Sequence, residues 1–353
     1  MKLHSLLSLR ALLPAALLAS TIAAGSAWSD GIKGAPPPFD KGGVKVALID
    51  YLSQGDYFEA YEAGVARQAK ALGIDLRIFQ GKQDAGQQRD QVEQAINLGV
   101  QGIIISHGQP ESLKDVVQRA INAGIKVVAK DIELGLPNVP LISQDDHDIA
   151  HQVLNQALKD NGTSFPAGYV FVAGFRPLES RGEIWADIKK ANPGIVEKAQ
   201  WGAVDSTTAT TVASQTAAVL RAHPEIRVVF APYDEFARGV KIGAAEAGVA
   251  DKIKVYSADV STSDIQDIRE PGSPWVATSA TNPAVVGEVS LRALALLIAG
   301  QDPGKVIDVK PFLITQAELI KNDIKTIGDL DAKLPGFGSS DQATAPWLGR
   351  PTL

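Results

Sequence analysis

The stretch VVFAPYDEFARGVKIGAAEAG, residues 228–248, decides the fold because a short apolar strand runs through an acidic turn into a helix rich in small residues. Residues 228–230 have the composition of a buried strand, and Pro232 ends it. Asp234 is suited to cap the helix that follows, and Gly248 to stop it. The helix carries an apolar stripe at helical spacing: Phe236, Val240, Ala244 and Ala247. The segment therefore predicts one strand-turn-helix unit of a parallel sheet.

The turn of this unit is a candidate binding position. In an open parallel sheet, ligands bind beyond the carboxyl ends of the strands. Tyr233, Asp234 and Glu235 stand at such an end. A capped turn without any ligand explains this single segment equally well.

The same unit repeats along the chain from Val44 onward. Glycines at 73, 99 and 124 each follow a helical stretch and precede a strand, which is typical of a doubly wound α/β lobe. A second series with the same layout starts at Tyr169, so two lobes are expected. The expected strands are 44–50, 75–79, 102–106, 126–130, 141–143, 169–174, 196–201, 228–230, 254–258 and 275–279, and the expected helices are 57–72, 85–98, 111–123, 147–159, 180–191, 207–222 and 263–269.

The last elements are expected to return to the first lobe. A helix at 283–299 and a strand at 306–309 come after the second series is complete. The lobes are therefore predicted as 44–144 plus 282–309 and 145–281 plus 310–330, joined by a three-strand hinge. Residues 331–353, rich in Gly, Pro and Ser, form a strap or a disordered tail, and Trp347 and Leu348 favour the strap.

Residues 1–27 have the pattern of a secretory leader. Lys2 and Arg10 precede or interrupt an apolar stretch, and small residues at 25 and 27 match a cleavage site. The chain has no cysteine, which excludes a lipid-modified cysteine, disulfides and thiolate metal sites. Free residence in the periplasm is expected. A formal net charge of -6 argues against nucleic acid, and no stable membrane insertion is expected once the leader is removed.

The usual catalytic and cofactor motifs are missing. The sequence has no phosphate loop, dinucleotide fingerprint, nucleophile elbow or HExxH helix, so neither a cofactor nor catalysis is expected. His147 and His151 are four residues apart near Asp145 and Asp146 and could share a metal. Helix capping explains the two acids better, so no metal site is predicted.

Polar residues recur at the predicted strand ends of both series. Carboxylates and an arginine near aromatic rings suit a sugar, because charged groups bind hydroxyls and ring faces cover C–H patches. Each residue taken singly could be a cap or a surface pair. The recurring residues are Asp50, Tyr51, Ser106, His107, Asp131, Arg181, Tyr233, Asp234, Asp259, Thr281 and Asn282.

Several of these stretches together resemble the periplasmic sugar-binding proteins of the ribose-binding type, the type I solute receptors of ABC importers. The likeness covers about residues 44–325. It rests on DYFEAYEAG, QVEQAINLGVQGIIIS, KVVAKD, SRGE, VVFAPYDEFARG and KVYSADV. Regulators of the lactose-repressor type share this fold but begin with a DNA-binding headpiece, whereas this chain begins with a leader.

The resemblance implies a monomer whose two lobes close around one small sugar or polyol, which an ABC permease then accepts. It implies that Tyr57 and Phe58 are aromatic walls and that Asp131, Arg181 and Asp259 are polar contacts. His107, Tyr233 and Thr281 complete the expected ligand-binding set because they stand at strand ends.

Four positions depart from the ribose-type pattern, in which polar or aromatic residues are expected. They are Ile132, Tyr233, Ala258 and Thr281. The lost donors beside a retained Asp, Arg, Asp core suggest a different pentose or hexose, a short polyol or a signalling furanose.

Two other function classes remain open at this stage. A sensory receptor would use the same cleft and dock on a chemoreceptor or sensor kinase. An exported sugar-modifying enzyme could use Asp131 and Asp259 as an acid and base pair, although paired carboxylates serve equally well to hold hydroxyls.

We predict that export removes the leader close to Ala27, because small residues at 25 and 27 follow the apolar stretch. Intact-mass measurement of the exported protein should give a chain that starts near Trp28. A mass that still includes residues 1–27 would contradict this.

Overall fold

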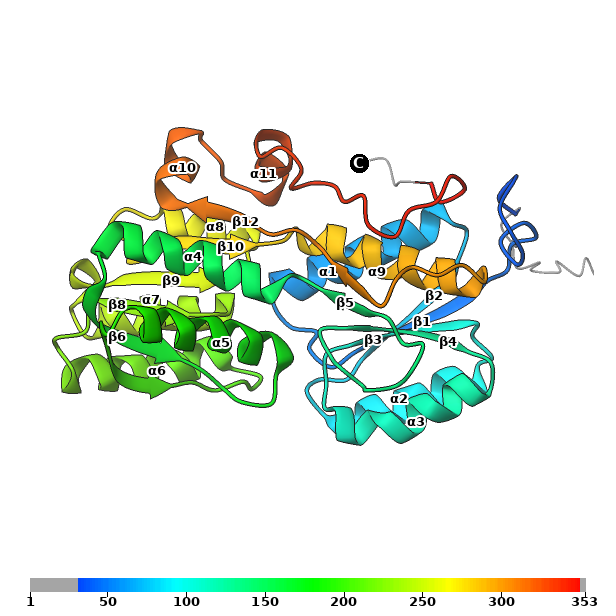
Figure 1. Cartoon of the computed structure of the whole chain (residues 1–353), viewed down its shortest axis with the longest axis horizontal. Coiled ribbons are helices and arrows are strands. Elements are labelled where there is room, and N and C mark those ends of the chain that lie inside the picture. The colour runs from blue at the N-terminus through cyan, green and yellow to red at the C-terminus, as the bar shows by residue number, and fades with distance from the viewer. Residues whose placement is uncertain (1–30, 350–353) are drawn as a thin grey trace, which may run out of the picture.

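The structure is a computed structural model that describes residues 31–349, so the predicted leader lies outside the described residues. Two six-stranded sheets form two lobes that lie side by side along the long axis (Figure 1). The first sheet has the order β11-β5-β4-β3-β1-β2, and the second has the order β12-β10-β9-β8-β6-β7. The expected α/β fold with two doubly wound lobes is confirmed.

All pairings in the first sheet are parallel. Its strands are β1 (Lys45–Asp50), β2 (Asp75–Gln80), β3 (Gly102–Ser106), β4 (Lys126–Lys130), β5 (Leu141–Ser143) and β11 (Val306–Asp308). One face packs on α1 (Asp56–Ala71) and α9 (Pro283–Ile298), and the other on α2 (Ala85–Asn97) and α3 (Pro110–Asn122). Covering helices on both faces explain why these strands are almost continuously apolar.

The second sheet is parallel except for its edge strand β12, which runs antiparallel to β10. Its strands are β6 (Ser164–Val170), β7 (Gly194–Trp201), β8 (Val228–Ala231), β9 (Lys254–Ala258), β10 (Trp275–Ala280) and β12 (Phe312–Thr315). Its helices are α4 (Asp146–Asn161), α5 (Arg176–Ala191), α6 (Thr208–Ala222), α7 (Asp234–Glu246), α8 (Thr262–Arg269), α10 (Gln316–Lys321) and α11 (Ile327–Lys333).

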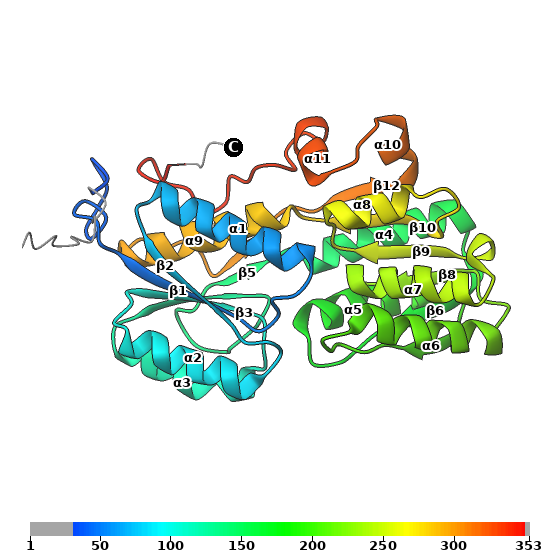
Figure 2. The same cartoon turned by 180° about the vertical axis from the view of Figure 1, so that it is seen from behind.

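The chain crosses between the lobes three times. The crossings lie at residues 143–146, 280–283 and 308–312, where consecutive elements belong to different sheets. Seen from behind, the same crossings join the lobes on one side of the molecule (Figure 2). The carboxyl ends of both parallel sheets therefore face each other across the space that the hinge spans.

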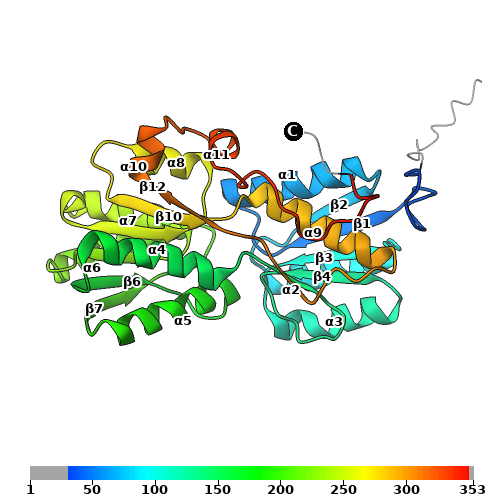
Figure 3. The same ribbon diagram turned by 45° about the horizontal axis from the view of Figure 1, so that its top comes forward.

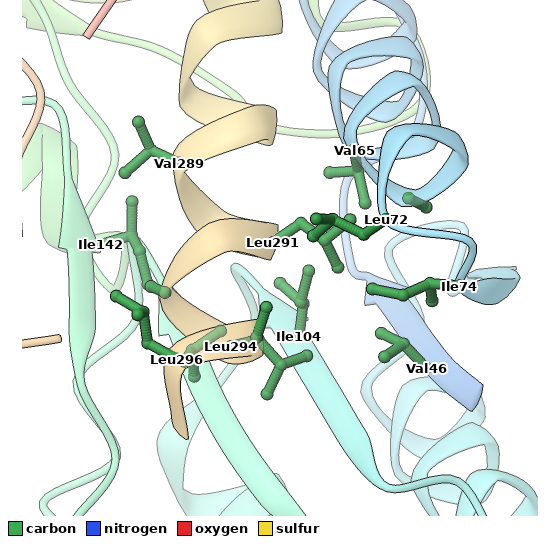
Figure 4. Packing of buried hydrophobic residues seen from close by; sticks show 14 of the residues in the cluster. Val46, Val65, Leu72, Ile74, Ile104, Ile142, Val289, Leu291, Leu294 and Leu296 are labelled. Carbon is green, nitrogen blue, oxygen red and sulfur yellow. The ribbon is translucent and has the colours of Figure 1, made fainter. Parts of the chain in front are cut away.

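The returning helix α9 forms the centre of the first-lobe core. Leu291, Leu294 and Leu296 project from it toward the sheet and α1 (Figure 4). Two glycines allow α1 and α9 to touch, because a Cβ on Gly64 would lie 2.0 Å from the Ala284 backbone oxygen and one on Gly287 would lie 2.3 Å from that of Tyr61. Close contact of the two backbones explains why α9 is apolar on nearly every side.

Three local predictions need correction. The first strand of the second series begins at Ser164 rather than Tyr169, and the next helix begins at Arg176 rather than Ser180. The stretch missed in each element contains a proline, which usually argues against a strand or a helix. Pro166 precedes the residues that pair with β8, and Pro177 lies in the first turn of α5, so both positions tolerate proline. Asp234 is not the helix cap. Tyr233 takes that position without a side-chain hydrogen bond.

The segment after α11 is packed along both lobes. Phe337 is 1 % exposed within the second-lobe core, and Leu348 is 6 % exposed within the first-lobe core. The rings of Phe39 and Trp347 lie 4.9 Å apart, and Gln68 donates to the Gly349 carbonyl at 2.9 Å. With its top turned forward, the molecule has this red segment running beside α9 and over the hinge (Figure 3).

We predict that Phe337→Ala lowers the free energy of unfolding by about 3–5 kcal/mol, because it empties a buried aromatic site in the second lobe. The control is Ile320→Ala on α10, where the side chain is 54 % exposed and the change should cost little. Urea unfolding of the two variants measures both. If Phe337→Ala were as stable as Ile320→Ala, the Phe337 side chain would not contribute to the stability of the fold.

Candidate functional site

Three polar residues at strand ends are turned toward the space between the lobes by left-handed backbone. His107, Asp131 and Asp259 follow β3, β4 and β9 with φ values of 56°, 54° and 71°. Such values are uncommon outside glycine and concentrate at functional sites. The amide groups of all three donate to neighbouring strands, which fixes the turns. Because of this conformation, these three side chains do not follow the alternation between the two sheet faces that the preceding strand residues show.

A pocket lies where the two lobes face each other, and its cavity volume is about 40 Å³. Both lobes and the first crossing contribute to its wall. The lining residues are Leu52, Tyr57, Phe58, His107, Gln144, Phe175, Pro177, Leu178, Arg181, Val204, Tyr233 and Asp259.

Arg181 on α5 is the charged centre of the pocket. Its guanidinium donates to both oxygens of Asp259 at 2.9 and 3.1 Å, to Asp146 Oδ1 at 3.0 Å and to the Pro232 carbonyl at 2.8 Å. The side chain is 1 % exposed, so two buried carboxylates share one buried cation. Burial raises the pKa of Asp146 to about 6, and Arg181 opposes that rise.

Asp131 lies at the first-lobe side of this centre. Its Oδ2 is 2.6 Å from Lys130 Nζ, accepts a hydrogen bond from Gln144 at 3.3 Å and lies 3.6 Å from His107 Nε2. Burial lowers the pKa of His107 to about 3, with a further contribution from Lys130, so the imidazole is neutral. Oδ1 has no hydrogen-bond partner within residues 31–349.

Most of the other lining residues are apolar or aromatic. Leu52, Tyr57 and Phe58 of the first lobe pack against Phe175 and Val204 of the second. The Tyr57 and Phe58 rings meet edge to face at 5.2 Å, and Phe58 meets His107 in the same way at 5.4 Å. The pocket therefore has a polar end around Arg181 and an apolar end beside it, an arrangement that suits a ligand with hydroxyls on one side only.

Comparisons with known proteins agree with this geometry. The periplasmic binding protein domain family matches residues 46–302. The chain belongs to the periplasmic binding protein family. This family is one of binding proteins, and the ribose-type resemblance is confirmed.

The chain is similar to solute-binding proteins of known structure and to curated sugar-binding proteins. A 5-methylthioribose transporter solute-binding protein from Thermotoga lettingae is 37% identical with a TM-score of 0.84, covering 86% of this chain and 97% of that one. A sugar ABC transporter protein from Yersinia enterocolitica is 32% identical with a TM-score of 0.83, covering 87% and 93%. The ribose import binding protein of Bacillus subtilis is 25% identical over 263 residues, covering 74% of this chain and 83% of the relative.

The two lobes of the binding protein are in direct contact. Across the mouth of the cleft, Ser263 of the second lobe donates to Asp56 at 2.5 Å, and Gln83 of the first lobe donates to the Asp205 carbonyl at 3.3 Å. Together with the apolar contacts of Phe175 and Val204, these bonds hold the two lobes against each other.

Six of the eight predicted ligand-binding residues line the pocket: Tyr57, Phe58, His107, Arg181, Tyr233 and Asp259. Asp131 and Thr281 lie one contact behind it, because each bonds to Gln144, which does line the wall. Whether any of them binds a ligand stays a prediction.

Sequence reasoning missed the apolar end and two polar residues. Gln144 and Asp146 follow β5 as the other polar residues follow their strands, and this position could have identified them. Leu52, Phe175, Pro177, Leu178 and Val204 carried no signal, because nothing in an apolar residue separates a pocket wall from a core. Lys130 carried no signal either, because the sequence identifies it only as the last residue of a predicted strand.

His147 pairs with Glu183 at 2.9 Å on the surface. In residues 31–349, no group of three histidine, cysteine or acidic side chains could hold a metal ion. No helix in the same range is long and apolar enough to cross a membrane.

We predict that Arg181→Met lowers the free energy of unfolding by about 3–5 kcal/mol at pH 8, because two buried carboxylates lose their cation. Without it the folded-state pKa of Asp146 rises further, because Arg181 opposes the rise that burial causes, so the folded protein binds more protons than the unfolded one and the loss shrinks toward pH 5. Urea unfolding at both pH values measures this. Arg89→Met, on the exposed side of α2, is the control, and an equal loss at pH 5 and pH 8 would refute the account.

Proposed function

We propose that this protein is the solute receptor of an ABC importer that captures a pentose bearing an apolar substituent at its C5 end, such as 5-methylthioribose. The carrying observation is the division of one interlobe pocket into a polar end at Arg181 and Asp259 and an apolar end at Leu52, Phe175 and Val204. The 37% identity to a receptor solved with 5-methylthioribose supports it.

The polar end would bind the ring hydroxyls. Each carboxylate oxygen that accepts from a hydroxyl forms a charge-assisted hydrogen bond, and Arg181 orients the Asp259 carboxylate by donating to both of its oxygens. The neutral His107 can donate from one ring nitrogen and accept at the other. The Tyr57 and Phe58 rings would cover the C–H face of the sugar.

The apolar end would take the substituent. A methylthio group presents no hydrogen-bond donor, and sulfur packs well beside aromatic rings. Ribose would place its C5 hydroxyl against Phe175 and Val204, where a buried hydroxyl lacks a partner. The unpaired hydroxyl would lower the affinity for ribose, and the pocket would therefore select 5-methylthioribose.

Delivery follows from the closed arrangement. A receptor whose lobes meet through Asp56 and Ser263 presents a different surface when open, so a permease can recognise the loaded state. The secretory leader pattern supports delivery in the periplasm. A sensor kinase or chemoreceptor could read the same closed surface and remains the second candidate.

We predict that 5-methylthioribose binds at least about tenfold more tightly than ribose, since burying a methylthio group contributes about 1.5 kcal/mol. Val204→Thr should weaken 5-methylthioribose binding and leave ribose unaffected, because it places a hydroxyl in the apolar end. Val196→Thr, on the same lobe at a side chain 46 % exposed, is the matched control.

Titration calorimetry on the three proteins decides this. Equal affinity for both sugars would remove the C5 substituent from the proposal. If no pentose, hexose or polyol raises the unfolding temperature, the sugar-binding role itself is wrong.

A further inference from the structure

Lys130 is a fully buried cation beneath the pocket. It ends β4, and its side chain is 0% exposed. Its ammonium lies 5.0 Å from the centre of the Tyr57 ring and 5.1 Å from that of Tyr61, and it donates to the Tyr57 hydroxyl at 3.3 Å. The strongest contact is with Asp131 Oδ2 at 2.6 Å.

This pair is not explained by stability. Burying a lysine and a carboxylate costs as much desolvation energy as their attraction returns, so an apolar pair would serve the core equally well. The neighbour on the other side of Asp131, Ile132, is buried in an apolar cluster. A buried ion pair directly behind the wall of a binding pocket, in contact with the lining residues Tyr57 and Gln144, therefore calls for a functional account.

We propose that Lys130 is a positioning residue of the sugar site, which holds Asp131 by Oδ2 and thereby leaves Oδ1 to accept a ligand hydroxyl. Lys130 itself does not line the pocket, and it acts through its neighbour. The identity of the ligand rests on the proposed function above, whereas the action of Lys130 on Asp131 does not.

Two observations carry the inference. Oδ2 receives Lys130 and Gln144 and lies near His107, while Oδ1 is buried and has no hydrogen-bond partner within residues 31–349. A buried carboxylate oxygen without a donor is costly unless something else binds it. A sugar hydroxyl donating to Oδ1 would satisfy the last acceptor of the carboxylate.

Electrostatics point the same way. Burial alone would raise the pKa of Asp131, but the adjacent Lys130 and then His107 lower it below its ordinary value. The charged and titratable groups around it are Lys130 on β4, His107 after β3, Arg181 on α5, Asp146 on α4, Tyr57 and Tyr61 on α1, and Asp50 at the end of β1. Burial raises the pKa of Asp50, and Lys130 opposes that rise.

The test is Lys130→Met, which keeps the length of the aliphatic stem and removes the charge. Lys126→Met, at the exposed start of the same strand, is the matched control. In the ligand-free proteins, carbon-detected NMR titration follows the Asp131 carboxyl. We expect its pKa to rise by one unit or more in Lys130→Met and to stay in place in Lys126→Met. The imidazole carbons of His107 resonate separately, so a change in its own pKa is distinguished.

Binding gives the second measurement. Calorimetry with 5-methylthioribose from pH 5 to pH 8 should give for the wild type only the pH dependence that comes from Asp146, whose pKa is about 6, because the pKa of Asp131 lies below its ordinary value. In Lys130→Met, affinity should fall toward pH 5 by up to tenfold per pH unit below the raised pKa, since a protonated carboxyl loses the charge that strengthens its bond to a hydroxyl.

The outcomes separate the two proposals. If the wild type ignores 5-methylthioribose yet the Asp131 pKa still rises, the ligand is wrong and the role of Lys130 stands. An unchanged Asp131 pKa overturns the role of Lys130. Should Lys130→Met fail to fold, Lys130→Met/Asp131→Asn removes the unpaired charge and should restore folding, and failure of this double variant as well would make Lys130 a packing residue.

Discussion

The shared cation at Arg181 is the interaction on which the site depends. It joins Asp146, immediately after the first crossing, to Asp259, at the end of a central strand of the second lobe. Two carboxylates buried at this distance would repel each other and take up protons without a cation between them. Arg181 therefore fixes the hinge side of the second lobe and the polar end of the pocket with one side chain.

The first lobe solves the same electrostatic problem differently. Asp131 is paired with Lys130, which approaches from beneath the aromatic wall instead of from the pocket. Different cations thus hold the two carboxylates, Lys130 for Asp131 and Arg181 for Asp259. Left-handed backbone at Asp131 and Asp259 turns both toward the ligand space, a strain that the surrounding strands support through hydrogen bonds to both amides.

The apolar end gives the pocket its selectivity. Phe175 precedes α5 and Val204 follows β7, so both come from loops of the second lobe, and they meet Leu52 and Phe58 across the gap between the lobes. Closure therefore assembles the pocket and buries apolar surface at the same time. A ligand that fills this end adds to the same burial and shifts the equilibrium toward the closed form.

The sequence by itself determined the alternation of strands and helices, the two lobes and the polar strand ends, because apolar periodicity, glycine stops and strand-end acids are local signals. Only the tertiary structure decided the partners. It paired Arg181 with Asp146 and Asp259, placed Thr281 behind Gln144, and assigned Leu52 and Val204 to a pocket wall. These contacts join residues far apart in the chain, and their positions depend on how two separately packed sheets are brought together by the hinge.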